Sequence, residues 1–191
     1  RLPPALAPSQ VVVLLIKEDE AVRSAAEALV AELRAAGIRV RLDDRTSISF
    51  GRRSVDWELK GVPVRVEIGP RDLAEGNVTL VTRHNREKKN LALAGVAKEI
   101  DGILDTVANE LRTEALELRR SRTVDAATLE EAIEAGAIGF ARLRVGVLGD
   151  DGEDQLAKTA LSVRCLQRAD GSLAEPGDNE ADLVAVVGRS Y

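Results

Sequence analysis

An apolar run at residues 11–16 constrains the fold of this chain more than any other feature. The run, VVVLLI, lies between Pro8 and a group of charged residues, which is typical of a strand buried on both faces. Aliphatic residues then recur at helical spacing over residues 17–36, and Gly37 is suited to end that helix in a left-handed conformation. Residues 38–42 alternate between aliphatic and arginine side chains, as in a second strand. A strand, helix and strand joined by short connections predict parallel pairing with a right-handed crossover.

Later segments extend this unit into an open sheet. We expect a short helix at residues 52–60 and two further strands at 62–68 and 78–82. A long helical region follows at 85–118, interrupted near Gly95 and Gly102. The predicted fold is α/β, an open mixed sheet of four to five strands flanked by helices.

The domain organisation follows from shifts in composition. A Pro-containing connector is expected at residues 1–9, the α/β domain at 10–120 and a small α+β module at 121–191. Within the module we expect a short helix over residues 123–136, capped by Thr123 or Asp125, followed by short strands and turns.

Charge and cysteine content exclude several classes of protein. The net charge of −5 indicates that any contact with RNA is local rather than spread over the surface. A single cysteine, Cys165, excludes a disulfide framework. Because no run approaches ~20 apolar residues and nothing resembles a signal peptide, we predict a cytoplasmic protein with no membrane partner. The chain contains no Met and begins at Arg1, so we expect a segment of a longer polypeptide.

Three charged residues recur at an interval of seven: Glu58 near a helix end, Arg65 on a strand and Asp72 after a Gly-Pro turn. Carboxylates accept hydrogen bonds from base amino and imino groups, and arginine donates a fork to a carbonyl and a ring nitrogen. The three side chains therefore suit reading of unpaired bases. The alternative is an ion-pair network in which Arg65 lies between two carboxylates, and spacing alone leaves both interpretations open.

The sequence around these three residues is more specific for a protein family than their spacing. The string WELKGVPVRVEIGPRDL at residues 57–73, with LDDR at 42–45 and LVTRHNREK at 80–88, resembles the anticodon-binding domain of class II aminoacyl-tRNA synthetases. The similarity covers residues 3–118 and is strongest to the prolyl-tRNA synthetases of the archaeal or eukaryotic-like type.

This resemblance implies a function in tRNA selection. It places Glu58, Arg65 and Asp72 at positions that read two guanines of the proline anticodon, so the expected partner is tRNA with that anticodon. It also implies an upstream catalytic domain that uses ATP and Mg to attach proline to tRNA, within a parent enzyme that forms a homodimer. For this segment we expect no catalytic residue and no cofactor.

Further arginines follow predicted strands, where open α/β sheets bind ligands. We predict that four of them contact the tRNA backbone: Arg45, Arg52, Arg71 and Arg86. Arg53 and Arg83 belong to the same set of loop arginines. His84, the only histidine, is expected in a loop close to RNA, and Trp57 is expected to pack in the fold, with base stacking as the alternative.

The C-terminal module resembles a family region that often carries four zinc-binding cysteines. Here only Cys165 is present, and a structural Zn²⁺ needs four ligands, so we predict no metal. The family also tends to end in an aromatic residue whose carboxylate approaches the catalytic domain, and Tyr191 matches that position.

Two other functions remain open from the sequence. The chain could be a free-standing anticodon-domain homologue that acts as a binding or interaction protein, or a small α/β enzyme with a site at Glu58, Arg65 and Asp72. Against an enzyme, no P-loop, GxGxxG motif or nucleophile elbow is present.

Overall fold

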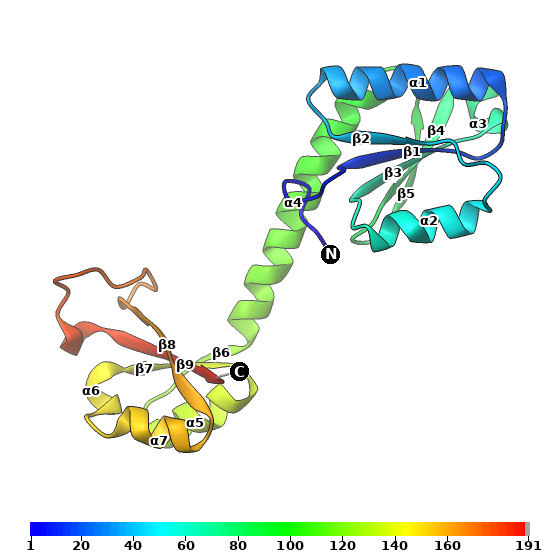
Figure 1. Ribbon diagram of the computed structural model, residues 1–191. Helices are drawn as coiled ribbons and strands as arrows, with labels where there is room; N and C mark the ends of the chain where they lie inside the picture. The colour runs from blue at the N-terminus through cyan, green and yellow to red at the C-terminus, as the bar shows by residue number, and fades with distance from the viewer. Residues whose placement is uncertain (190–191) are drawn as a thin grey trace. The chain divides into compact units, whose positions relative to one another are not determined.

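The computed structural model describes residues 1–189 and divides the chain into two units, residues 1–113 and 114–191 (Figure 1). Each unit is described by itself. The elements that begin in the first unit are β1 (Val11–Leu15), α1 (Glu20–Ala35), β2 (Val40–Asp43), α2 (Phe50–Leu59), β3 (Val64–Ile68), α3 (Pro70–Ala74), β4 (Asn77–Thr82), β5 (Lys88–Ala92) and α4 (Val96–Ser121). Because α4 starts at Val96 and ends at Ser121, it belongs to both units.

The sheet of the first unit has five strands in the order β2-β1-β3-β4-β5. Strand β1 pairs in parallel with β2 and β3, while β4 pairs antiparallel with β3 and β5. The predicted open mixed sheet is confirmed. The parallel centre explains why β1 is apolar at every position, since helices cover both of its faces.

Two helical layers enclose this sheet (Figure 1). Helix α1 and the start of α4 pack on one face, against Val11, Val13 and alternate residues of the neighbouring strands. Helix α2 packs on the other face, where Trp57 and Phe50 contact the small cluster around Val12. The start of α1 is fixed by Asp19, whose side chain accepts a hydrogen bond of 3.0 Å from the Val22 backbone N–H.

The helical region expected at residues 85–118 is wrong at its start. Residues Lys88–Ala92 form strand β5, and the helix begins only at Val96, after Gly95 adopts a positive φ of 84°. A tight turn makes the strand possible, because Asn85 Oδ1 accepts hydrogen bonds from the Thr82 hydroxyl and the Glu87 backbone N–H. Helix α4 then runs through Gly102 without a break, since its aliphatic stripe packs on the sheet.

The second unit is a smaller α+β structure. Its four-stranded sheet has the order β6-β7-β9-β8, with β6 and β7 parallel and the other pairs antiparallel. One face packs against helices through buried Ala141, Leu143, Ala185 and Val187 (Figure 1). The elements are β6 (Thr123–Asp125), α5 (Leu129–Ile138), β7 (Phe140–Arg144), α6 (Val145–Leu148), α7 (Gly152–Lys158), β8 (Leu161–Gln167), the 3₁₀ turn η1 (Glu180–Asp182) and β9 (Val184–Arg189).

The helix expected at residues 123–136 is present as α5, but its start and the cap expected at Thr123 or Asp125 are wrong. Residues 123–125 form strand β6, and α5 is capped by Thr128. Thr128 Oγ1 accepts from the Glu131 backbone N–H, while the Glu131 carboxylate accepts from the Ala127 N–H. This reciprocal pair resembles a capping box and fixes the cap at Thr128, three residues after the end of β6. Tyr191, for which a terminal role is predicted, lies outside the described residues.

Candidate functional site

Arg65 lies in a pocket of about 190 Å³ that the side chains of β3, β4 and α2 form beside the sheet. We call it the Arg65 pocket; its polar lining comes from Glu58, Arg65, Thr82, Arg83, Arg86 and Lys88. The Arg65 side chain is only 12% exposed. Its Nε donates to Glu67 at 2.8 Å and its Nη1 donates to Glu58 at 3.2 Å.

These two contacts leave part of the Arg65 guanidinium open to a ligand. Nη2 makes no hydrogen bond with any described residue from 1 to 189. Glu67 is buried, whereas the Glu58 carboxylate is 45% exposed and can exchange its contact for one with a ligand. The pocket therefore presents one oriented donor group next to one accessible acceptor.

Glu67 is the partner of Arg65 that sequence reasoning missed. The signal was its spacing, because residues two apart on a strand point to the same face. The predicted third member, Asp72, lies instead in α3, after the far end of β3. Between Arg65 and Ile68 the strand rises roughly 10 Å. The structure thus brings Glu58 and Arg65 together and places Asp72 beyond the opposite end of the strand.

The end of α2 positions Glu58. The helix ends at Leu59, and Gly61 turns the chain into β3 with a positive φ of 78° that suits glycine. Arg83 holds this corner, because its Nε donates at 2.8 Å to the Glu58 carbonyl and its N–H donates at 2.8 Å to the Pro63 carbonyl. Arg83, which directly follows β4, thus fixes the backbone position of Glu58.

Strand register continues the polar surface across the sheet. Arg65 is in line with Val81 of β4 and Lys88 of β5, and Glu67 is in line with Thr79 and Asn90. Lys88 and Asn90 are exposed. Two rows of side chains therefore run from the Arg65 pocket to the edge of the sheet, on the face that carries α2.

The four arginines predicted to contact the tRNA backbone lie in different surroundings. Arg86 lines the Arg65 pocket and has a positive φ of 60°. Arg45 is paired with Asp43 at 2.7 Å. Arg52 and Arg71 are exposed and lie away from the pocket lining. Of the four, Arg86 alone shares a site with Arg65.

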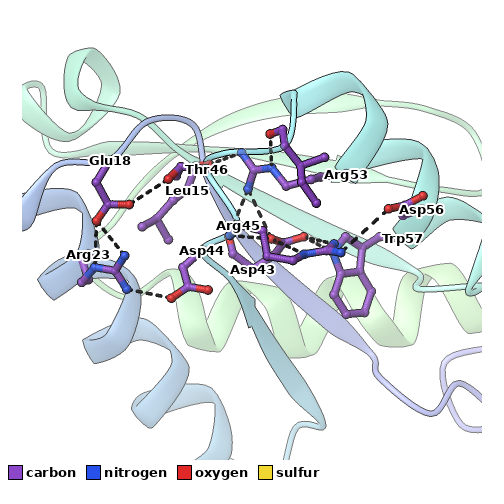
Figure 2. Close-up of polar contacts among 11 residues, drawn as sticks. Leu15, Glu18, Arg23, Asp43, Asp44, Arg45, Thr46, Arg53, Asp56 and Trp57 are labelled. Carbon is purple, nitrogen blue, oxygen red and sulfur yellow. Dashed lines mark hydrogen bonds and ion pairs between the residues drawn. The ribbon is translucent and has the colours of Figure 1, made fainter.

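A second polar cluster ties together the C-terminal ends of β1 and β2 (Figure 2). Its centre is Asp43, whose side chain is fully buried. Asp43 accepts from Trp57 Nε1 at 2.6 Å, from Arg45 Nη2 at 2.7 Å and from Arg53 Nη1 at 3.4 Å. Burial alone would raise the pKa of the Asp43 carboxyl, but the hydrogen bonds from Arg45 and Trp57 outweigh it and hold that pKa well below its usual range.

Arg53 completes this cluster with backbone contacts. Its guanidinium, 1% exposed, donates to the carbonyls of Leu15 at 2.7 Å, Asp43 at 3.2 Å and Ile48 at 3.1 Å. It is therefore a structural residue rather than a ligand for RNA. Because Trp57 precedes Glu58 on α2, the cluster also anchors the helix that carries one side of the Arg65 pocket.

The two aromatic side chains that could contact RNA are both engaged within the fold. Trp57 is partly buried, and the Lys60 ammonium lies 4.2 Å from the centre of its ring. His84 Nε2 contacts the Glu110 carboxylate of α4, and the His84 side chain is 8% exposed. The packing role expected for Trp57 agrees with these contacts, whereas His84 is more buried than a loop position suggested.

Charge is divided unequally between the units. Residues 1–113 contain eighteen Lys and Arg against seventeen Asp and Glu, whereas residues 114–191 contain nine against fifteen. The overall charge of −5 therefore belongs to the second unit, and the unit with the Arg65 pocket is nearly neutral. In the described residues 1–189 no helix is long and apolar enough to cross a membrane, and no three His, Cys, Asp or Glu side chains are grouped as metal ligands.

Comparisons with known proteins identify one matching family model and several similar proteins. Residues 10–103 match the family model described as "Anticodon binding domain". The chain is 51% identical over 191 residues to a proline–tRNA ligase of Frankia casuarinae, covering all of this chain and 41% of the relative, and 36% identical over 205 residues to one of Chloroflexus aggregans, covering 42%. The chain thus spans about two fifths of the length of these relatives.

Solved structures show the same fold. A prolyl-tRNA synthetase from Cryptosporidium parvum, complexed with L-proline and AMP, matches 99% of this chain and 42% of its own with a TM-score of 0.84 at 24% identity. The family match covers the whole sheet of the first unit, with the Arg65 pocket and α3. Residues 10–103 therefore match the anticodon-binding-domain family, and the chain is similar along its whole length to part of the proline–tRNA ligases.

Proposed function

We propose that this chain selects tRNA by its anticodon as part of a proline–tRNA ligase, and that Glu58, Arg65 and Asp72 read the anticodon bases. The observation that carries the proposal is the state of Arg65, a nearly buried guanidinium that two carboxylates orient while Nη2 is left for a ligand. Such a fork matches the O6 and N7 acceptors of guanine. The exposed Glu58 carboxylate beside it would accept from the amino and imino groups of the same or a neighbouring base.

The distance between Arg65 and Asp72 suits two bases rather than one. Asp72 lies in α3, beyond the far end of β3, and its side chain has no hydrogen-bond partner within residues 1–189. We therefore assign one guanine to Glu58 and Arg65 and a second to Asp72. Arg83, Arg86 and Lys88 line the Arg65 pocket and would attract the phosphates next to the first base.

The remaining parts of the proposed activity lie outside this chain. The whole protein would activate proline with ATP and Mg and transfer it to tRNA, acting as a homodimer in the cytoplasm. Support comes from the relatives, which are proline–tRNA ligases more than twice as long as this chain. No residue of the Arg65 pocket is assigned a catalytic role.

The test is binding of anticodon stem-loops to the full 191-residue chain. Arg65→Ala should weaken binding of the proline stem-loop by about 1–3 kcal/mol, because one bidentate base contact is lost. Stem-loops with the guanines replaced should bind the variant and the parent chain equally. Arg34→Ala is the matched control, since Arg34 is exposed on α1, which covers the opposite face of the sheet. Equal losses for cognate and altered stem-loops would reject base reading by Arg65.

A further inference from the structure

The second unit contains a pocket of about 440 Å³ that the anticodon-reading site does not use. It lies on the β-sheet face opposite the helices, because Phe140 and Arg142 alternate along β7 with Ala141 and Leu143, which pack against α5. We call it the β7 pocket and define it by Arg119, Arg120, Phe140, Arg142, Arg164 and Cys165.

The β7 pocket gathers positive charge in a unit that is acidic as a whole. Four of the nine Lys and Arg residues in 114–191 line it, with Asp125 as the one acidic residue in the lining. The other acidic residues of the unit lie elsewhere, many of them on α5, on α7 and in the loop before α7. A basic pocket on an acidic unit favours an anionic ligand at this place, since scattered surface arginines would follow the composition of the unit.

Arg142 is held ready at the centre of the β7 pocket. Its Nη1 contacts Asp125 at 3.3 Å and its Nη2 donates to the Ala169 carbonyl at 3.2 Å. Its Nε–H is buried, with no hydrogen-bond partner in residues 1–189. A buried donor without an acceptor costs free energy, and an anionic oxygen would satisfy it.

Phe140 supplies a flat apolar surface beside these arginines. The ring packs against Gly188 of β9, where an added Cβ would lie 2.7 Å from the Phe140 Cδ1. Glycine thus lets the ring lie close to the sheet, while the residue stays 40% exposed. An exposed aromatic ring next to arginines on an open sheet is the arrangement that stacks bases and neutralises phosphates of single-stranded nucleic acid.

We infer that the β7 pocket is a second RNA-binding site, which takes a single-stranded segment with one base on Phe140 and its phosphates on Arg119, Arg120, Arg142 and Arg164. Only the source of this RNA rests on the proposed function, under which the ligand would come from tRNA. The site itself does not depend on the Arg65 pocket. Its specificity is for an unpaired strand rather than for a base sequence, because every base has a face that can stack.

Cys165 gives a direct readout, because it is the only cysteine and lines the β7 pocket. With the full chain, an octamer of oligouridylate at low salt should slow modification of Cys165 by a thiol reagent, in proportion to occupancy. Phe140→Leu should weaken octamer binding at least about five-fold, through loss of stacking, while its apolar side chain still covers Gly188. Arg120→Gln should make the salt dependence of log K less steep by about 0.7.

Three comparisons make the outcome decisive. Lys158→Gln, on α7, removes an equal charge outside the β7 pocket and should leave octamer binding unchanged. Arg65→Ala should leave protection of Cys165 by the octamer unchanged, because Cys165 lines the β7 pocket and not the Arg65 pocket, so failure of the anticodon assignment and failure of this inference are separable. Unaltered Cys165 reactivity at saturating octamer, or equal protection by hexaglutamate or inorganic phosphate, would overturn the RNA site. A melting curve for each variant confirms that the compared proteins are folded.

Discussion

At the scale of single residues, the Arg65 pocket depends on a carboxylate that never needs to touch RNA. Glu67 is buried and holds the Nε side of Arg65 at 2.8 Å, which fixes the plane of the guanidinium. Arg65 and Glu58 could be proposed from spacing and resemblance, since both are polar residues in a specific string. Glu67 could not be singled out from the sequence, because on a strand such as β3 the residues two positions before and after Arg65 lie on the same face and equally close to it.

The first prediction concerns this positioning role. Glu67→Gln keeps an oxygen acceptor of the same size but removes the charge, so Arg65 should be held less firmly. Discrimination between proline and altered anticodon stem-loops should fall by about three-fold to ten-fold, because a weaker neutral hydrogen bond replaces the charge-assisted one, while binding of altered stem-loops stays the same. Glu67→Asp, with a shorter carboxylate, should recover part of the discrimination. A uniform loss for every stem-loop would show that Glu67 serves stability alone.

The second prediction concerns Asp43. Asp43→Asn should lower the free energy of unfolding by about 3 kcal/mol, because the buried Arg53 guanidinium loses its charged partner. Asp44→Asn is the matched control. Asp44 pairs with Arg23 at 2.8 Å on the surface, so its removal should cost less than about 1 kcal/mol. Urea unfolding of the three chains measures both differences, and similar losses for the two variants would contradict a special role of the buried network.

A pH dependence follows from the lowered pKa of Asp43. The folded-state pKa lies below that of the unfolded chain, about 3.9, so the stabilisation is complete above the unfolded value. As pH falls below about 4, the unfolded chain gains the proton first and the stabilisation is lost progressively. The difference in unfolding free energy between parent chain and Asp43→Asn should therefore be constant near neutral pH and shrink in acid. A difference that grows in acid would reverse the assigned direction.

At the scale of elements, helices and strands with a repeating apolar pattern could be predicted from the sequence, whereas elements whose position depends on a single turn or cap could not. The strands at residues 11–15 and 64–68 and helix α1 follow from apolar runs and helical spacing. The sequence predicts helix where strand β5 forms, because KKNLA carries little apolar alternation and the pairing of β5 depends on the Asn85 turn. The start of α5 was misplaced because Thr123 and Asp125 are good caps in isolation, whereas the reciprocal pair Thr128 and Glu131 satisfies more backbone donors.

Capping gives the third prediction. Asp19→Ala should lower the free energy of unfolding by about 1 kcal/mol, since the Val22 N–H at the start of α1 loses its acceptor. Asp19→Asn should cost only a few tenths of that, because asparagine caps nearly as well. Thermal unfolding followed by circular dichroism provides the measurement. An equal loss in both variants would indicate that charge, rather than the cap, is what α1 requires.

At the scale of the whole molecule, composition misleads when it is averaged over two units. A net charge of −5 argues against phosphate binding, but the acidic excess lies in residues 114–191. The division between residues 113 and 114 falls inside α4. Because the helical pattern of the sequence is continuous there, no change in pattern marks the boundary. The β7 pocket could not be found from charge spacing, because it draws its arginines from α4, β7 and β8, which are distant in the sequence.

The fourth prediction distinguishes residues of the first unit that attract RNA phosphates from residues that recognise anticodon bases. Arg86→Gln should weaken proline and altered stem-loops alike and make the salt dependence less steep by about one unit or less, as loss of one phosphate contact requires. Asp72→Asn should reduce discrimination among anticodons and leave the salt dependence unchanged, because a carboxylate adds no attraction for phosphate. Titrations at several salt concentrations distinguish the two classes. Tighter binding of every stem-loop by Asp72→Asn with unchanged preference would make Asp72 ordinary surface charge.

The lysines of β5 have a consequence for self-association. β5 is the last strand of its sheet, so one row of its backbone N–H and C=O groups has no neighbouring strand within residues 1–189. Such an edge can pair with another molecule and lead to aggregation. Lys88 and Lys89 place two positive charges on consecutive residues, hence on both faces of that edge, and a second copy approaching it would meet the same charges. Lys88 and Lys89, which make this segment look unlike a strand in the sequence, therefore oppose edge-to-edge pairing of β5 with a second copy of the chain.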